Sequence, residues 1–367
     1  MLESLCIKNY RNLKEFRIGS VNQINLITGK NNTGKTSLLE AIAIYAGRGD
    51  FQLLFQLLDN RGENFTQNRS TNDRTVLLRS LSAMFSGRGT DFTDEMTLFI
   101  GDTTKSDKYI SFRFVKYFEE VQRNEQGVTF RNRQIFNDEA DNDNDYQIGL
   151  HISSGEQQEL IPVDRDRLYY RSRFEGFSGN DRFQFIRTAT IDRDTNGRLF
   201  DTIALSEKEK FVIEALKIIE PTTERIAFIE VNPKERIAVI KLSNASEIIP
   251  LRSMGDGLNR VFSIILALVN ADNGFLLLDE FENGIHHTVQ EKLWKIIFNL
   301  SKSLNVQVFA TTHSDDSISA FQRVLNSSDN SSRGKLIRLD NVNGNIKPAE
   351  YSPQELKIAN DQDIETR

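Results

Sequence analysis

A run of eight residues, Gly29-Lys30-Asn31-Asn32-Thr33-Gly34-Lys35-Thr36, has the spacing of a phosphate-binding loop. It matches the P-loop pattern G-x-x-x-x-G-K-[ST] at every fixed position. Glycines let backbone N–H groups wrap around a phosphate where a Cβ would collide. Lys35 would then bridge the β- and γ-phosphates, and the Thr36 hydroxyl would bind Mg²⁺. The sequence therefore predicts ATP and Mg²⁺ as cofactors. The expected nucleotide contacts here are Gly29, Asn31, Asn32, Thr33, Gly34, Lys35, Thr36 and Ser37.

Two further polar groups follow apolar strands near the end of the chain. Asp279 and Glu280 come directly after the run Phe275–Leu278. Asp279 would hold Mg²⁺ through water, and Glu280 would polarise the attacking water. His313 follows the next predicted strand and could reach the γ-phosphate there. A lone loop histidine is more often a plain surface residue, but the position of His313 after the other motifs favours a catalytic role. We also expect a catalytic role for Glu280.

The elements around these motifs are those that a P-loop needs. Gln23–Thr28 reads as a buried strand, and Thr36–Ala46 is apolar at helical spacing, so the loop ends at a helix N-terminus. In the last third, the helix Val289–Leu300 lies between Phe275–Leu278 and the strand Val306–Ala310. Strands that alternate with helices indicate a parallel sheet.

A third motif, Ser253-Met254-Gly255-Asp256-Gly257, precedes a predicted helix that begins at Leu258. The order of P-loop, Ser-x-Gly-x-Gly, Asp-Glu and Thr-His-Ser resembles the ABC-type ATPases of the branch that contains RecF, SMC and OLD proteins. The chain also looks like the bacterial AAA family ATP-binding proteins of antiphage systems, including those of the PARIS and OLD kind. The resemblance spans nearly the whole chain.

This resemblance implies a fold, partners and further site residues. The implied fold is an α/β ABC-type P-loop ATPase head with a mixed or parallel core sheet, an antiparallel β-lobe and a helical or irregular insertion. Arg11 and Asn12 would lie near the adenine and the α-phosphate. Ser253 and Gly255, with their neighbours Asp256 and Gly257, would reach the γ-phosphate of a second subunit. A homodimer or higher homo-oligomer would then form around two ATP molecules. Glu282 to His286 look like the D-loop of that branch.

Some features depart from the family pattern. Ser-Met-Gly-Asp-Gly differs from the transporter signature Leu-Ser-Gly-Gly-Gln, so a transporter is disfavoured, and Ser37–Arg252 holds no sustained heptads. The Q-loop glutamine has no clear place, and Gln134, Gln157 and Gln158 are only candidates. The stretch after His313 is too short for the Toprim nuclease domain of OLD proteins, so we expect any effector chemistry on another polypeptide.

Residues 1–345 fit one ABC-type domain whose lobes are separated in the sequence. We expect a P-loop lobe over 1–60, an inserted helical and β-rich region over 60–200, and a lobe carrying the later motifs over 200–345. Within these lobes the predicted elements include strands at Met96–Ile100, Tyr109–Tyr117 and Gly127–Phe136, and a β-hairpin of Ile226–Val231 with Ile237–Leu242. Residues 346–367 read as a polar C-terminal tail.

The stretch from Arg165 to Arg198 combines arginines with aromatic residues. Cations and rings together suit a nucleic-acid surface, but interspersed acidic residues favour a salt-bridged surface or a protein interface. A second charged segment, Asn137–Tyr146, is acidic and lacks the glycine and the closing glutamate of an EF-hand, so it reads as a solvated loop.

Composition limits the remaining possibilities. The chain has 367 residues, 27% of them charged, a formal net charge of -6 and one cysteine. Such a chain can build a large core but offers no disulfide framework, and its charge argues against broad DNA affinity. No apolar run approaches the ~20 residues that cross a bilayer, so we expect a cytoplasmic protein that does not enter membranes.

Together these features predict an ATPase whose ATP-dependent dimerisation controls a separately encoded effector, such as a nuclease, in antiphage defence. A RecF-like DNA-repair ATPase that binds DNA directly is the alternative. A nucleotide-dependent scaffold with very slow hydrolysis is a third.

Overall fold

The computed structural model describes most of the chain. The described residues are 1–65, 75–90, 93, 96–102, 105, 108–123, 129–136, 146–163, 177, 182–187, 193–232, 235–327 and 330–362. The acidic segment 137–145 and much of the arginine-rich stretch, including Arg171 and Arg173, lie outside them.

A mixed sheet forms the centre of the described structure, in the order β16-β15-β3-β14-β13-β9. All neighbouring pairs are parallel except β15 and β16. Its strands are β3 (Ile24–Thr28), β9 (Phe183–Ile186), β13 (Phe275–Leu278), β14 (Gln307–Thr311), β15 (Gly334–Val342) and β16 (Asn345–Tyr351). Strands β3, β13 and β14 are buried along their whole length, as expected for parallel strands covered on both faces.

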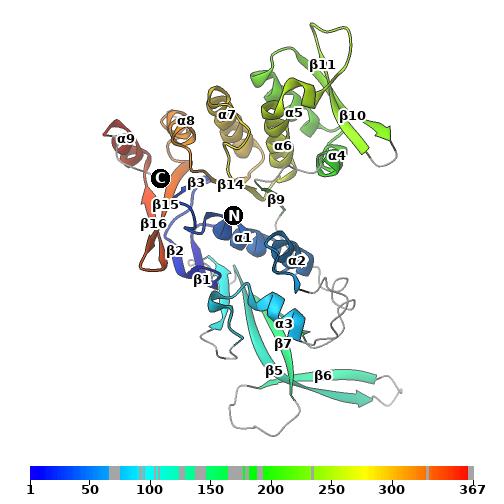
Figure 1. Cartoon of the computed structure of the whole chain (residues 1–367), viewed down its shortest axis with the longest axis vertical. Helices are drawn as coiled ribbons and strands as arrows, with labels where there is room; N and C mark the ends of the chain where they lie inside the picture. Colours follow the sequence, from blue (N-terminus) through cyan, green and yellow to red (C-terminus); the bar gives the residue numbers. More distant parts are fainter. Residues whose placement is uncertain are drawn as a thin grey trace.

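Alternate residues of these strands enter two separate cores. Ile27 and Leu277 pack in one core with helix α1, whereas Leu26 and Leu276 pack in the other with helices α6, α7 and α8. The helices are α1 (Lys35–Ala46), α6 (Asp256–Asn270), α7 (His287–Ser303) and α8 (Asp315–Leu325). Nearly every residue of α1 is buried, because this helix lies between the central sheet and a second sheet (Figure 1).

The second sheet is antiparallel, in the order β2-β1-β4-β5-β7-β8, with β6 paired to β5. Its strands are β1 (Leu5–Tyr10), β2 (Leu13–Ile18), β4 (Leu98–Gly101), β5 (Tyr109–Arg123), β6 (Thr129–Phe136), β7 (Gln147–Ser154) and β8 (Gln157–Pro162). Beside it run α2 (Phe51–Asn60), α3 (Thr75–Ser82) and the short turn η2 (Ser86–Arg88). The distal part of β5 and its partner β6 extend away from the body (Figure 1).

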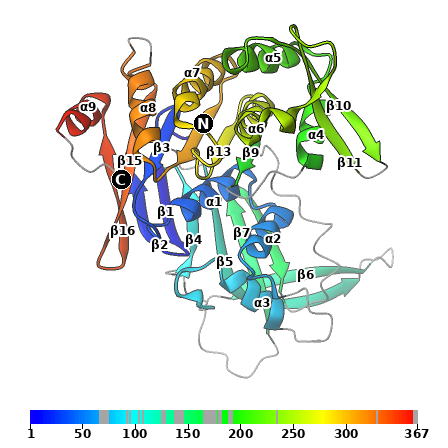
Figure 2. The same cartoon turned by 45° about the horizontal axis from the view of Figure 1, so that its top comes forward.

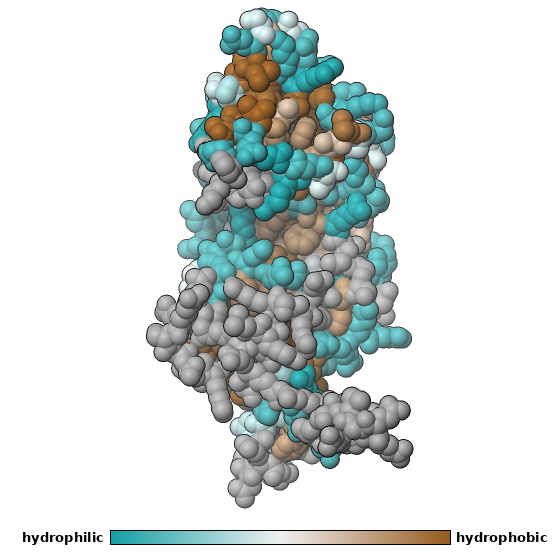
Figure 3. Space-filling model, turned by 90° about the vertical axis from the view of Figure 1, so that its right-hand side faces the viewer, coloured by the Kyte–Doolittle hydropathy of each residue, from teal (hydrophilic) through white to brown (hydrophobic). Residues whose placement is uncertain are grey.

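A smaller lobe covers the opposite end of the molecule (Figure 2). It contains the sheet β10-β11-β12. Its elements are α4 (Arg193–Asp201), α5 (Glu207–Ile219), β10 (Thr223–Asn232), β11 (Glu235–Leu242), β12 (Ile249–Pro250) and the 3₁₀ turn η5 (Leu251–Met254). Apolar side chains gather on the surface at this end of the molecule (Figure 3), and Val231 and Ile248 are among the exposed ones of this lobe.

The structure confirms the expected α/β class, with a mixed core sheet and an antiparallel β-lobe. It divides the chain differently from our lobes, however. The N-terminal strands β1 and β2 belong to the same sheet as β4 to β8, and β9 belongs to the central sheet. The division at residues 60 and 200 therefore does not follow the sheets, because strand pairing joins segments that are distant in sequence.

The C-terminal region also differs from the expected polar tail. Strand β16 pairs with β15 from Tyr351 to Asn345, and α9 (Pro353–Asp361) follows it. Leu356 of α9 is fully buried in the core that contains α8. Ala359 of the same helix is also buried, so this short helix docks through one narrow face. In the described residues no helix has the length and apolar character needed to cross a membrane.

Candidate nucleotide-binding site

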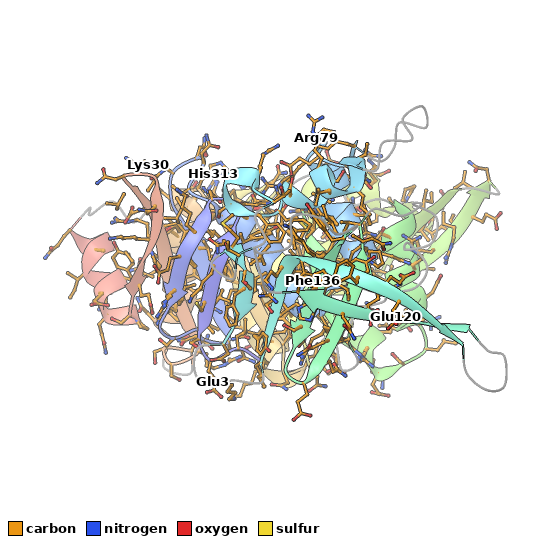
Figure 4. All side chains as sticks on the ribbon, turned by 90° about the horizontal axis from the view of Figure 1, so that it is seen from below. Glu3, Lys30, Arg79, Glu120, Phe136 and His313 are labelled. Atoms are coloured by element: carbon orange, nitrogen blue, oxygen red, sulfur yellow. The ribbon has the colours of Figure 1, made fainter. Side chains whose placement is uncertain are left out.

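Parallel strands bring three of the four sequence motifs, all except Ser-x-Gly-x-Gly, to one edge of the central sheet. The P-loop follows β3, Asp279 and Glu280 follow β13, and Thr312 and His313 follow β14. Ligands of open α/β sheets bind at the carboxyl ends of the strands. Lys30 and His313 lie on one side of the molecule, and Glu3, which precedes β1, lies on the other (Figure 4).

Two glycines of the P-loop have backbone angles and neighbours that exclude other residues. Gly29 has φ 137° and Gly34 has φ 87°. A Cβ at Gly29 would lie 2.6 Å from the Leu339 carbonyl oxygen, and one at Gly34 would lie 2.9 Å from Asn12 Nδ2. Glycine is therefore required at both positions, and the loop leads directly into the N-terminus of α1, whose free N–H groups suit an anion.

The Lys35 ammonium is held by the loop itself. Its Nζ donates hydrogen bonds to the carbonyl oxygens of Gly29, at 2.6 Å, and Lys30, at 3.0 Å. Burial lowers the pKa of Lys35, and the negative charges of Asp279, Glu280 and Glu282 act against this lowering. The negative charges of three carboxylates therefore act on Lys35, the cation that is expected to contact the terminal phosphates.

The two expected metal ligands touch each other. Thr36 Oγ1 lies 3.0 Å from Asp279 Oδ2, and Thr311 Oγ1 donates a hydrogen bond of 2.7 Å to Asp279 Oδ1. Asp279 is 7% exposed, so its carboxylate is fixed by these contacts at the floor of the site. A hydroxyl beside a carboxylate is a set of hard oxygen donors of the kind that Mg²⁺ prefers. These residues fit the metal.

Glu280 has an unusual backbone conformation for a residue with a side chain. Its φ is 50°, in the left-handed region, which costs on the order of 1–3 kcal/mol. Thr311 holds it there, because Thr311 Oγ1 accepts from the Glu280 N–H at 2.9 Å and the Thr311 carbonyl accepts from the Phe281 N–H at 2.9 Å. Strained residues that neighbours hold in place cluster at functional sites.

A cavity of about 950 Å³ opens between these groups. Its lining combines P-loop residues with the expected catalytic and metal-binding residues and with several that the sequence did not suggest. The lining includes Arg11, Asn12, Asn31, Asn32, Thr33, Gly34, Lys35, Thr36, Ser37, Asp279, Glu280, Arg61, Glu63 and Arg88. The cavity is strongly polar, as a triphosphate pocket must be.

Arg11, expected near the adenine and the α-phosphate, is engaged in buried ion pairs. Its Nε lies 3.2 Å from Glu40 Oε2, and its Nη1 lies 2.6 Å from Glu63 Oε2. Burial would lower the pKa of Arg11, but Tyr10, Glu40 and Glu63 raise it above its ordinary value, so the guanidinium stays charged. Arg11 therefore contributes to the wall mainly as a structural cation. Its neighbour Asn12 keeps a buried Oδ1 without a hydrogen-bond partner beside Gly34.

Two arginines at this wall were not anticipated, because neither belongs to a recognisable motif. Arg61 follows α2, contacts Glu40 at 3.0 Å and donates to Ser37 Oγ at 3.3 Å. Arg88 pairs with Glu63 at 2.6 Å. Arg61 reaches the P-loop because α2 packs against α1. Arg88 reaches it because Ser86 of the same turn donates a hydrogen bond to the Arg11 carbonyl oxygen at 2.8 Å.

The Ser-x-Gly-x-Gly motif lies away from this cavity. Ser253 is in η5, Gly255 has φ 101°, and α6 begins at Asp256. None of them lines the P-loop cavity within the described structure; Ser253 and Asp256 instead line a separate cavity of about 350 Å³. A Cβ at Gly257 would lie 3.1 Å from the Gly284 carbonyl oxygen, so the motif packs against the loop from Glu282 to His286.

None of the three candidate Q-loop glutamines lies at the site. Gln134 is in β6, and Gln157 and Gln158 are in β8, within the antiparallel sheet. On the side of β13 that faces away from β14 lies β9, and Arg187 directly follows β9. Arg260 of α6 donates to the Arg187 carbonyl oxygen at 3.0 Å and to the Asp279 carbonyl oxygen at 3.3 Å, so it joins the ends of β9 and β13.

The P-loop between β3 and α1, with an Asp-Glu pair at the end of a nearby parallel strand, defines a P-loop ATPase with an ABC-type head. A protein-family model described as "AAA domain, putative AbiEii toxin, Type IV TA system" matches residues 24–319. The chain belongs to this family.

Individual proteins are also similar to the chain. An "ATP/GTP phosphatase" of Helicobacter pylori is 26% identical over 384 residues, which cover 97% of each chain. A "DNA replication and repair protein RecF" of Rickettsia prowazekii is 47% identical over 49 residues, 13% of this chain and 14% of that protein. The solved SmcHead bound to the C-winged helix domain of ScpA covers 96% of this chain and 97% of its own, with 13% identity and a TM-score of 0.49.

Proposed function

We propose that the chain hydrolyses ATP in an ATP-bridged dimer and that this dimer is a switch for a separately encoded effector in antiphage defence. The observation that carries the proposal is the separation of Ser253 and Asp256 from the P-loop cavity. A signature serine outside its own nucleotide cavity is available to the nucleotide of a second copy.

The main groups of the site have defined parts in this proposal. The P-loop N–H groups and Lys35 would bind the β- and γ-phosphates. Thr36 and Asp279 would hold Mg²⁺, which supplies charge stabilisation for phosphoryl transfer. Glu280, fixed by Thr311, would orient a water and accept its proton. Ser253 and Gly255 of the partner copy would complete the site opposite Lys35.

Dimerisation is the property that tests the proposal directly. A Glu280→Gln form should bind ATP without turnover, and its molar mass by light scattering should double on adding ATP and Mg²⁺. Ser253→Arg, introduced into Glu280→Gln, should still bind ATP but keep the chain monomeric. A Glu280→Gln chain that stays monomeric at saturating ATP would contradict the bridged dimer. GTP belongs in the same experiment, because the Helicobacter relative is named for both nucleotides.

The biological setting rests on two supports. The family description names a toxin and a toxin–antitoxin system, and the sequence resembles ATPases of antiphage systems. A dimer that closes on ATP has two states, so a partner that binds one of them responds to the nucleotide. We expect protection against phage to require both Lys35 and the partner gene. Cells that carry the Lys35→Ala variant together with the intact partner should therefore not be protected.

A second candidate is a DNA-repair ATPase, favoured by the short RecF match. It predicts sub-micromolar binding to duplex DNA with a steep salt dependence. Replacing Arg171 and Arg173 should then abolish that binding. Weak binding at physiological salt that is unaffected by these replacements would leave the switch as the better account.

A further inference from the structure

Glu282 makes contacts that its expected place in the D-loop does not explain. Its Oε1 accepts a hydrogen bond from the His313 backbone N–H at 3.0 Å and lies 3.1 Å from His313 Nδ1. One carboxylate oxygen therefore holds both the backbone and the ring of the same histidine. The D-loop of the resembled family would act toward a second subunit, whereas this carboxylate faces its own chain.

We propose that Glu282 is a positioning residue that fixes the ring of His313 for the nucleotide site. The inference rests on the proposed ATP hydrolysis. Because a carboxylate oxygen repels an unprotonated ring nitrogen at this distance, the 3.1 Å approach of Oε1 favours a proton on Nδ1. In the neutral ring the other nitrogen, Nε2, is then the acceptor that we assign to the nucleotide site. His313 itself is not among the residues that line the P-loop cavity in the described structure. The nitrogen that contacts a carboxylate fixes the tautomer and the orientation of an imidazole.

The surroundings of Glu282 favour this role over that of a surface acid. Its side chain is 13% exposed, whereas that of His313 is 54% exposed. Its second oxygen, Oε2, is buried without a hydrogen-bond partner. A buried carboxylate needs nearby positive charge, and Glu282 is close enough to Lys35 to act on its pKa. Glu282 thus contacts the histidine at the end of β14 and adds negative charge near the P-loop lysine.

Glu280 is not the partner of this histidine in the structure. Although Glu280 lines the cavity, the carboxylate that contacts His313 belongs to the residue two positions later. The two acids would therefore have different roles. Glu280 would act on the attacking water, and Glu282 would orient the His313 ring.

Nuclear magnetic resonance of ¹⁵N-histidine-labelled protein tests the contact without turnover. The wild type should show His313, assigned by loss of its signals in His313→Asn, protonated on Nδ1. Glu282→Ala should shift His313 toward the Nε2–H form that a free imidazole favours, and Glu282→Gln, which keeps an accepting oxygen, should restore the Nδ1–H form. An unchanged tautomer in Glu282→Ala would overturn the proposal.

Kinetics test the consequence. Glu282→Ala should lower kcat about 10- to 100-fold, the range for groups that orient a functional histidine, with KM for ATP unchanged. Glu282→Gln should lose less. The double variant Glu282→Ala/His313→Ala should be no slower than His313→Ala alone. Glu291→Ala, which removes a surface glutamate paired with Lys295 and Arg323, should leave turnover unchanged.

The alternatives give different results. If Glu282 acts on the second subunit through the D-loop, the effects of the two single variants multiply, and the proposal fails. If Glu282→Gln is as inactive as Glu280→Gln while His313→Ala is active, Glu282 acts directly and the proposal also fails. A wild type without ATP or GTP hydrolysis would refute the proposed function instead, and the tautomer measurement would still decide the contact.

Discussion

At the scale of single residues, the site is a set of charges held by contacts to the backbone and to hydroxyl side chains. The Lys35 ammonium donates to the Gly29 and Lys30 carbonyls and lies in the field of three carboxylates. Asp279 is clamped between Thr36 and Thr311. Each group therefore has its own fixed contacts, and loss of one group should produce a specific defect.

Lys35→Ala should lower the affinity for ATP by about 10- to 100-fold or more, because a charge-assisted hydrogen bond contributes roughly 1.5–3 kcal/mol. Isothermal titration calorimetry measures the change. Lys30→Ala is the matched control, since the exposed Lys30 side chain lies in the same loop. Equal affinities of the Lys35 variant and the control would remove the P-loop from the account.

Glu280→Gln should bind ATP normally and hydrolyse it about 10²- to 10⁴-fold more slowly, because an amide cannot accept a proton from water. Phosphate release at saturating ATP measures turnover. Normal hydrolysis by this variant would show that another residue is the base.

At the scale of elements, the central sheet depends on segments from both ends of the chain. Strand β15 pairs with the P-loop strand β3, and its Leu339 carbonyl closes the space beside Gly29. Strand β16 and helix α9 then cover that side of the sheet. The C-terminal elements therefore pack against the P-loop strand and the first glycine of the loop.

Leu356→Ala in α9 should destabilise the protein by about 2–5 kcal/mol, the usual loss for a buried leucine. Ile358→Ala in the same helix should change stability by less than about 0.5 kcal/mol, because Ile358 is 53% exposed. Urea unfolding of the two variants makes the comparison. Equal small effects would show that α9 does not contribute to the core.

At the scale of the whole molecule, two sheets enclose α1, and the smaller lobe presents Ser253 away from the P-loop cavity. The residues after Ser314 form α8, β15, β16 and α9, which complete the central sheet and its cover. The described part of this region is thus used by the ATPase core.

We therefore expect the purified chain, with ATP and Mg²⁺ or Mn²⁺, to cleave neither DNA nor RNA, and toxicity to require a partner. Incubation with plasmid and total RNA, followed by electrophoresis, is the measurement. Cleavage that persists in Lys35→Ala but is lost when Asp138, Asp141, Asp143 and Asp145 are replaced would assign nuclease chemistry to this chain; those aspartates lie outside the described residues.

The sequence alone identified the P-loop, the Asp279–Glu280 pair and the α/β class, because phosphate binding depends on local backbone geometry and parallel strands carry a local apolar pattern. It did not reveal the ion pairs of Arg11, the approach of Arg61 and Arg88, or the contact of Glu282 with His313. It also placed 346–367 in a tail and separated β1 and β2 from β4 to β8. These features depend on strand pairing and packing between distant segments, and only the tertiary structure determines which of them meet.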